Sequence, residues 1–152
     1  MEEFKSIDDV LDMAIKDEIR ASNLYAGLAK KSRNKEIQKV FEQFSKEELG
    51  HKKKLENIKS SGKIAVQPKA IQDLKIGDYI VDVDTSREDL TYQEALIVAM
   101  KEEKRAFKLY TDLAARTDDP DTRETFLMLA QEEARHKLRF EIEYDDYILT
   151  EN

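Results

Sequence analysis

Two Glu-x-x-His pairs are the residues of this sequence best suited to chemistry. They are Glu48 with His51, and Glu133 with His136. Residues three apart on a helix lie one turn apart on the same face, so each pair presents a carboxylate and an imidazole together. Oxygen donors combined with imidazole suit Fe or Mn, and Zn or Co also accept them. A single such pair on a charged helix is usually solvated, and the recurrence of the pair makes a metal site the stronger hypothesis.

Two further glutamates lie in apolar stripes in the same way as the two pairs. Glu18 and Glu103 are flanked by apolar residues at helical steps of three and four, which predicts that they face the protein interior. Buried carboxylates are costly unless they are paired or bind a metal, and no Lys or Arg shares these stripes nearby. Two divalent cations would balance the four negative charges. The predicted ligands of this dinuclear site are Glu18, Glu48, His51, Glu103, Glu133 and His136.

Four amphipathic helices are predicted to position these residues. Each is about 25 residues long, which corresponds to about 37 Å. Residues with good N-cap side chains, among them Ser6, Asn34, Thr91 and Asp119, stand where the helices are expected to begin. The apolar spacing places the helices at 7–31, 35–59, 92–116 and 120–148. The expected fold class is therefore all-α, a four-helix bundle.

An offset of 85 residues relates the two halves of the sequence. Residues 14–29 and 41–56, compared with 99–114 and 126–141, show 15 identities in 32 positions, at apolar and polar sites alike. This similarity predicts two helical hairpins built on one plan. The chain is expected to form a single domain, 1–152, that consists of a hairpin at 6–60, a crossover at 61–90 and a hairpin at 91–148.

The crossover differs in composition from the helices. It contains three of the few turn-forming residues, Gly62, Pro68 and Gly77, and its alternating run at 79–83 is predicted to be extended. A connection of this length can travel along the whole bundle. The second and third helices are then expected to run in the same direction.

Composition excludes several function classes. The 152 residues carry a net charge of -7, which makes nucleic acid and anionic membrane surfaces unsuitable partners. The absence of cysteine excludes disulfides, thiolate metal sites and cysteine nucleophiles. No apolar run approaches the roughly 20 residues of a membrane span, and the N-terminus lacks a signal-peptide core. A cytoplasmic location is the expectation.

Two tyrosines share a helix face with predicted ligands. Tyr25 and Tyr110 follow Glu18 and Glu103 by seven residues, about 10 Å along the helix axis. They are either ordinary core aromatics or hydrogen-bond donors to a ligand carboxylate across the bundle, with a role in catalysis in the second case. Four acidic residues beside the ligands are expected to be solvated or to adjoin the ligands: Asp17, Glu47, Glu102 and Glu132.

With these residues the sequence resembles the rubrerythrin-like branch of the ferritin-like di-iron carboxylate proteins, over essentially its whole length. The resemblance implies a ferritin-like bundle with two iron ions on the six residues named above. It implies an oxidoreductase that reduces hydrogen peroxide or dioxygen, often in defence against oxidative stress. It also implies a homodimer or a larger assembly.

Two departures from the rubrerythrin pattern carry expectations of their own. Full rubrerythrins have a rubredoxin domain with a Cys₄ iron, and this cysteine-free chain is expected to use an external electron donor such as a rubredoxin. Rubrerythrins also carry an additional glutamate one turn after the third-helix ligand, where Arg105 and Ala106 stand here. The alternatives to a peroxidase are ferritin-like iron oxidation for storage or delivery, and a purely structural helical bundle.

Overall fold

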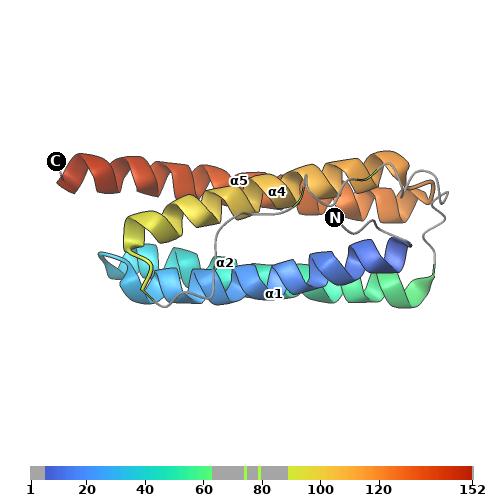
Figure 1. Cartoon of the computed structure of the whole chain (residues 1–152), viewed down its shortest axis with the longest axis horizontal. Helices are drawn as coiled ribbons and strands as arrows, with labels where there is room; N and C mark the ends of the chain where they lie inside the picture. Colours follow the sequence, from blue (N-terminus) through green and yellow to red (C-terminus); the bar gives the residue numbers. More distant parts are fainter. Residues whose placement is uncertain (1–5, 63–73, 75–78, 80–88, 152) are drawn as a thin grey trace.

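A computed structural model describes residues 6–62, 74, 79 and 89–151. Within these residues the chain forms four helices in two antiparallel hairpins (Figure 1). The all-α bundle predicted from the sequence is confirmed. The helices are α1 (Ile7–Lys31), α2 (Lys35–Ser61), α4 (Tyr92–Arg116) and α5 (Pro120–Glu151). The starts of all four match the prediction, and α2 and α5 continue slightly beyond their predicted ends.

The helix starts follow from local side-chain chemistry. At each start an oxygen of the capping side chain accepts a hydrogen bond from a backbone N–H of the first turn, which would otherwise lack a partner. Thr91 and Glu94 form a complete capping box. The other capping residues are Ser6, Asn34 and Asp119. Helix α2 ends at Gly62, whose φ of 63° is a left-handed conformation that glycine adopts without steric cost.

Helices α2 and α4 run in the same direction, as predicted (Figure 1). The end of α2 and the beginning of α4 therefore lie at opposite ends of the bundle (Figure 1). The run at 79–83 is predicted to be extended, and its residues 80–83 lie outside the described residues. Two described residues of this segment, Leu74 and Tyr79, are buried in the core, and the Tyr79 hydroxyl donates to Asp112 of α4 at 2.7 Å.

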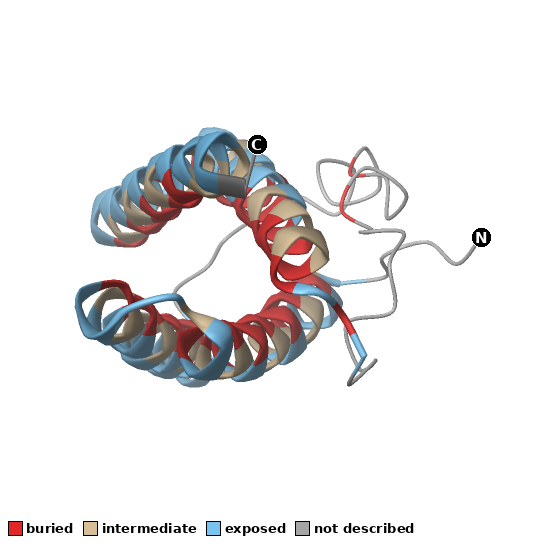
Figure 2. Cartoon of the chain, turned by 90° about the vertical axis from the view of Figure 1, so that its left-hand side faces the viewer, coloured by how far each residue is buried: buried red, intermediate tan, exposed pale blue. Residues whose placement is uncertain are grey.

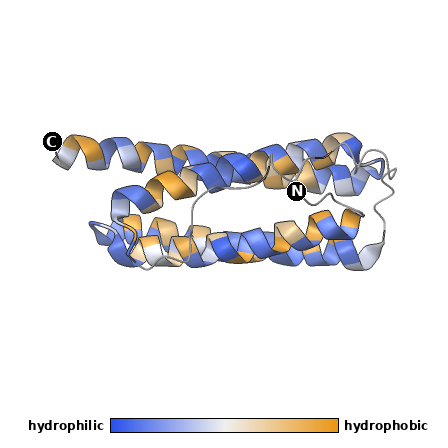
Figure 3. Ribbon diagram, in the orientation of Figure 1, coloured by the Kyte–Doolittle hydropathy of each residue, from blue (hydrophilic) through white to orange (hydrophobic). Residues whose placement is uncertain are grey.

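The apolar core is divided into two clusters along the bundle axis. One cluster joins the beginning of α1 to the end of α2 and contains Leu11 and Leu55, and the other joins the end of α1 to the beginning of α2 and contains Leu28 and Phe41. Buried residues face the inside of the bundle (Figure 2), and a hydrophilic band lies between the apolar ends of the helices (Figure 3). On each helix the predicted ligands lie between residues of one cluster and residues of the other. Each is thereby shielded from water on both sides along the axis.

The two hairpins meet more closely on one side than on the other. Helix α1 packs against α4, whereas α2 and α5 approach each other less closely (Figure 2). No helix in the described ranges combines the length and apolarity needed to cross a bilayer.

Candidate metal centre

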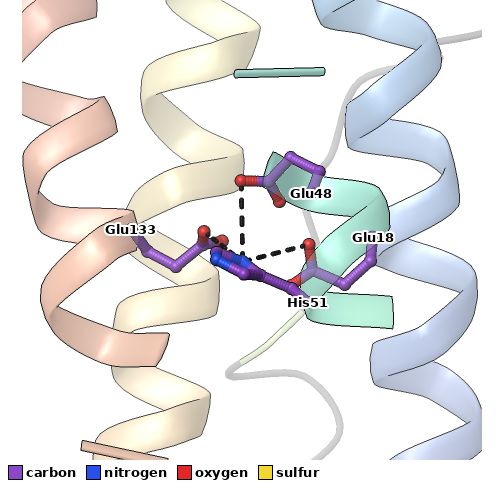
Figure 4. A group of neighbouring side chains, drawn as sticks. All are labelled: Glu18, Glu48, His51 and Glu133. Atoms are coloured by element: carbon purple, nitrogen blue, oxygen red, sulfur yellow. Dashed lines mark ion pairs between the residues drawn. The ribbon is translucent and has the colours of Figure 1, made fainter. Parts of the chain in front are cut away.

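The six predicted ligands lie together in the middle layer of the bundle. Each is at most 2% exposed. They form two overlapping groups of four, and within each group one ligand atom per residue lies within 4.8 Å of the others. Glu48 and Glu133 belong to both groups, so two metals bound here would share their carboxylates. Glu18 and His51 complete one group (Figure 4), and Glu103 and His136 complete the other.

Both histidines direct Nδ1 toward the centre. His51 Nδ1 lies 3.0 Å from Glu133 Oε1 and 3.7 Å from Glu18 Oε2 (Figure 4). His136 Nδ1 lies 2.8 Å from Glu48 Oε1 and 3.6 Å from Glu103 Oε2. Each imidazole thus faces the carboxylate of the opposite Glu-x-x-His pair. We call these two halves of the centre the His51 position and the His136 position.

The outer nitrogen of each histidine meets a glutamate from the other hairpin. Glu132 of α5 accepts a hydrogen bond from His51 Nε2, and Glu47 of α2 lies 3.2 Å from His136 Nε2. An outer carboxylate at Nε2 fixes the ring orientation and leaves Nδ1 directed at the centre. Sequence reasoning left it open whether Glu47 and Glu132 are solvated or adjoin the ligands. The structure places both beside the histidines.

The two tyrosines cross between the hairpins. Tyr25 of α1 donates a hydrogen bond to Glu103 of α4, and Tyr110 of α4 donates to Glu18 of α1. Both hydroxyls are buried, and burial together with the nearby carboxylates raises the pKa of each tyrosine well above its usual value. They are therefore neutral donors. Each holds one oxygen of a carboxylate and leaves the other directed at the centre.

The buried polar atoms of the six residues show that the site fits a metal. Each of the six residues has at least one buried nitrogen or oxygen without a hydrogen-bond partner in the described chain. Such atoms are rare in folded proteins because desolvation without a partner is costly. Here they converge on one centre and combine carboxylate oxygens with imidazole nitrogens. Cations at this centre would provide the missing partners.

The electrostatics of the cluster agree with a missing positive charge. Burial, followed by the charge of neighbouring glutamates, raises the pKa of Glu48 well above its usual value and that of Glu133 to about 7. Burial also raises the pKa of Glu103, against a lowering hydrogen bond from Tyr25. At Glu18 burial raises the pKa, but the interactions with the neighbouring Glu48 and then with His51 lower it overall. Cations would replace the protons held by these carboxylates.

A second ionic cluster lies between α1 and α4, next to the ligands. Arg105 contacts Asp17 at 2.9 Å and Glu102 at 3.4 Å, and Arg20 contacts Glu102 at 2.8 Å. Asp17, Glu102 and Arg105 are buried, so of the two possibilities left open for Asp17 and Glu102, a place beside the ligands holds and solvation does not. In the described part of the chain, the ion pairs of these arginines are made with Asp17 and Glu102 and not with the ligands. The identity of Arg20 and Arg105 at the 85-residue offset was the available sequence signal.

The family model described as Rubrerythrin matches residues 9–144. The chain belongs to the rubrerythrin family. No curated protein matched the sequence.

Two solved structures resemble the fold of this rubrerythrin-family chain. A ferritin-like diiron-carboxylate protein from Thermotoga maritima has a TM-score of 0.78 at 22% identity, over 97% of this chain and 99% of that chain. A hypothetical protein from Pyrococcus furiosus has a TM-score of 0.69 at 25% identity, over 92% of this chain and 89% of that chain. The ferritin-like bundle implied by the sequence resemblance is confirmed.

In this family member the side of the centre nearer His136 carries a groove. A cavity of about 410 Å³ lies between α2 and α5, where the two helices diverge. Phe44 and Glu47 line it from α2, and Arg135 and Leu138 line it from α5. The Phe44 ring stacks on His136 with a centroid separation of 4.0 Å. The groove therefore ends at residues that touch the His136 position.

Proposed function

We propose that this chain is a di-iron carboxylate redox protein that reduces hydrogen peroxide or dioxygen. The observation that carries the proposal is the convergence of six buried side chains, each with an unpartnered ligand atom, on one centre. Membership in the rubrerythrin family and the ferritin-like fold support it. A structural bundle has no use for buried, unpartnered carboxylates, which lower its stability.

The donor set would hold two metal ions. Glu18 and His51 would bind one, Glu103 and His136 the other, and Glu48 and Glu133 would bridge them. Four carboxylates balance two divalent cations, and hard oxygen donors with one imidazole per metal favour iron or manganese, with zinc and cobalt as substitutes. We take iron as the native metal.

The protein contributes orientation, charge and exclusion of water. When bound, two irons would supply the two electrons that, with two protons, convert one hydrogen peroxide into two waters. Tyr25 and Tyr110 hold the outer carboxylates in place, and Glu47 and Glu132 hold the imidazoles. The apolar clusters at both ends keep bulk water from the centre.

The cycle needs an electron source, and separately we propose that the chain assembles with copies of itself. The reduced state would be restored by an external electron-transfer protein such as a rubredoxin. A homodimer or larger assembly is proposed from the family resemblance. Peroxide-dependent oxidation of reduced rubredoxin by the iron-loaded protein would test the donor, and light scattering would test the assembly.

Metal analysis followed by peroxide addition tests the proposal. Protein loaded anaerobically with Fe(II) should contain about two irons per chain, and peroxide should then change its near-UV absorption as the iron is oxidised. Loss of both histidines, His51→Ala with His136→Ala, should abolish both results. Glu141→Gln removes an exposed carboxylate of α5 and is the matched control. Little bound metal, with an unchanged melting temperature on adding Fe(II), would overturn the proposal.

A further inference from the structure

The outer carboxylates of the two histidines occupy corresponding positions in the two hairpins. Glu47 and Glu132 are 85 residues apart, as are His51 and His136. Each glutamate contacts the histidine of the other hairpin. On this count alone the His51 and His136 positions would be alike.

Arg135 breaks this likeness. Its guanidinium donates a hydrogen bond to Glu47 Oε1, the same oxygen that faces His136 Nε2 at 3.2 Å. The residue 85 positions earlier is Gly50, which has no side chain to reach Glu132. Within the described chain, the hydrogen bond of Glu132 is made with His51. One outer carboxylate is therefore shared with an arginine, and the other is not.

A second unlike pair holds Arg135 in place. The guanidinium carbon lies 5.7 Å from the centroid of the Phe44 ring, which itself stacks on His136. The residue that corresponds to Phe44 is Leu129, which offers no aromatic face. Arg135, Glu47, Phe44 and His136 thus form one contact group. Both members of this group that differ from their counterparts in the other hairpin, Phe44 and Arg135, are therefore in contact with each other.

This difference affects how strongly each imidazole can serve a metal. A carboxylate that accepts a hydrogen bond from a ligating histidine fixes the ring and strengthens it as a donor, and loss of such a partner typically costs 10–100-fold in metal affinity. A guanidinium on the same oxygen competes for that carboxylate and neutralises part of its charge.

We propose that Arg135 makes the two metal positions unequal, so that the His51 position binds metal more tightly than the His136 position. The proposal rests on the metal-binding function proposed above. Arg135 acts as a positioning residue through Glu47, since it does not itself face the centre. The weaker position is then the one next to the groove between α2 and α5.

Cobalt titration of the metal-free protein, followed by visible absorption against a competing chelator, tests this proposal. His51→Ala isolates the His136 position, and His136→Ala isolates the His51 position. In the His51→Ala background, Arg135→Ala should tighten cobalt binding about tenfold. In the His136→Ala background the same substitution should leave binding unchanged within about twofold, because Glu132 has no arginine to lose.

A gain of arginine provides the reciprocal test. Gly50 is exposed, and a Cβ added there meets nothing within 4 Å. Gly50→Arg should place a guanidinium near Glu132 and weaken the His51 position about tenfold, which brings the two binding steps of the otherwise unchanged protein together. Arg139→Ala is the control, because Arg139 lines the same groove without a hydrogen bond to Glu47.

Three outcomes would overturn the proposal. They are an equal effect of Arg135→Ala in both histidine backgrounds, an equal effect of Arg135→Ala and Arg139→Ala, and no effect of Gly50→Arg in a protein whose helical circular dichroism is unchanged. Absence of cobalt binding to the unsubstituted protein would instead refute the metal site itself. The two failures are therefore distinguishable.

Discussion

The two hairpins are alike at the centre and unlike one step further out. Both supply a Glu-x-x-His pair, a single glutamate and a tyrosine, at the same depth and with the same crossed contacts. Around this centre, one side has Phe44, Leu138 and Ile142, and the corresponding residues on the other are Leu129, Lys53 and Asn57. Residues that could bind metal are thus repeated more faithfully than the residues around them.

The pKa values of the two histidines differ between the two sides. Burial opposes the charged form of both. At His51, the nearby carboxylates of Glu132, Glu133 and Glu18 outweigh burial and raise the pKa to about 12. At His136 burial dominates and lowers the pKa, although Glu133 and Glu47 act in the opposite direction. Identical ligands in related hairpins therefore need not behave identically, since the next layer of residues sets their charge balance.

The largest effect is expected from the carboxylates that the two sides share. Glu48→Ala or Glu133→Ala should reduce bound iron from about two per chain to nearly none, because each carboxylate belongs to both ligand groups. Glu18→Ala or Glu103→Ala should each remove about one. Elemental analysis of protein prepared anaerobically measures this. Retention of one full iron after loss of Glu48 would show that the positions are independent.

A large difference in stability is expected between two identical residues, Arg105 and Arg20. The Arg105 side chain is 5% exposed, so Arg105→Ala would leave Asp17 and Glu102 buried without their main cation and cost about 3–5 kcal/mol. The Arg20 side chain is 40% exposed, and its loss should cost about 1 kcal/mol or less. Urea unfolding of both metal-free variants gives the comparison. Equal costs would mean that solvent screens both arginines alike.

The metal-free protein should lose stability as the pH rises. The folded-state pKa of Glu133 is about 7, above its ordinary 4.5, so folding takes up a proton between these values. Stability from this group is present below about pH 4.5 and is lost as the pH rises through 7, on the order of 2 kcal/mol. Glu48 and Glu103 shift in the same direction.

Calorimetry between about pH 5 and 8 measures this dependence. Glu133→Gln, which cannot ionise, should flatten it. Metal affinity should show the opposite trend and increase with pH, because cations displace the protons of these carboxylates. A metal-free protein that becomes more stable over this range would contradict the buried, proton-holding cluster.

A small effect on stability, equal on the two sides, is expected from the tyrosines. Tyr25→Phe and Tyr110→Phe each remove one hydrogen bond to a buried carboxylate, worth about 1.5 kcal/mol of unfolding free energy. Thermal unfolding of the iron-loaded variants compares them. The two losses should agree within about 0.5 kcal/mol. Clearly unequal losses of stability would mean that the two sides already differ at the ligand carboxylates.

The sequence predicted the helices and the six clustered residues because both depend on local periodicity. A carboxylate in phase with apolar residues has to face the core, whichever helices surround it. Contacts between hairpins were not predictable in this way. Glu47 and Glu132 lie outside the apolar stripes, and only the packing of α2 toward α5 brings them to the histidines.

The same limit applies to charged residues that meet from distant parts of the chain. Arg33, after the end of α1, contacts Glu143 of α5 at 2.9 Å, and Tyr92 at the beginning of α4 donates to the same carboxylate at 2.7 Å. Glu143 is buried as a result. Each residue alone suits a solvated surface, and its role depends on the partner that tertiary packing supplies.

The division of the ligands between the hairpins has a kinetic consequence. Each hairpin closes through a short turn and can form from contacts near in sequence, which form rapidly. Every group of four ligands, however, includes residues from both hairpins, so the complete cluster exists only after the hairpins dock. Bound metal should then slow unfolding more than it accelerates folding, and the loaded protein would resist heat chiefly through its lifetime in the folded state.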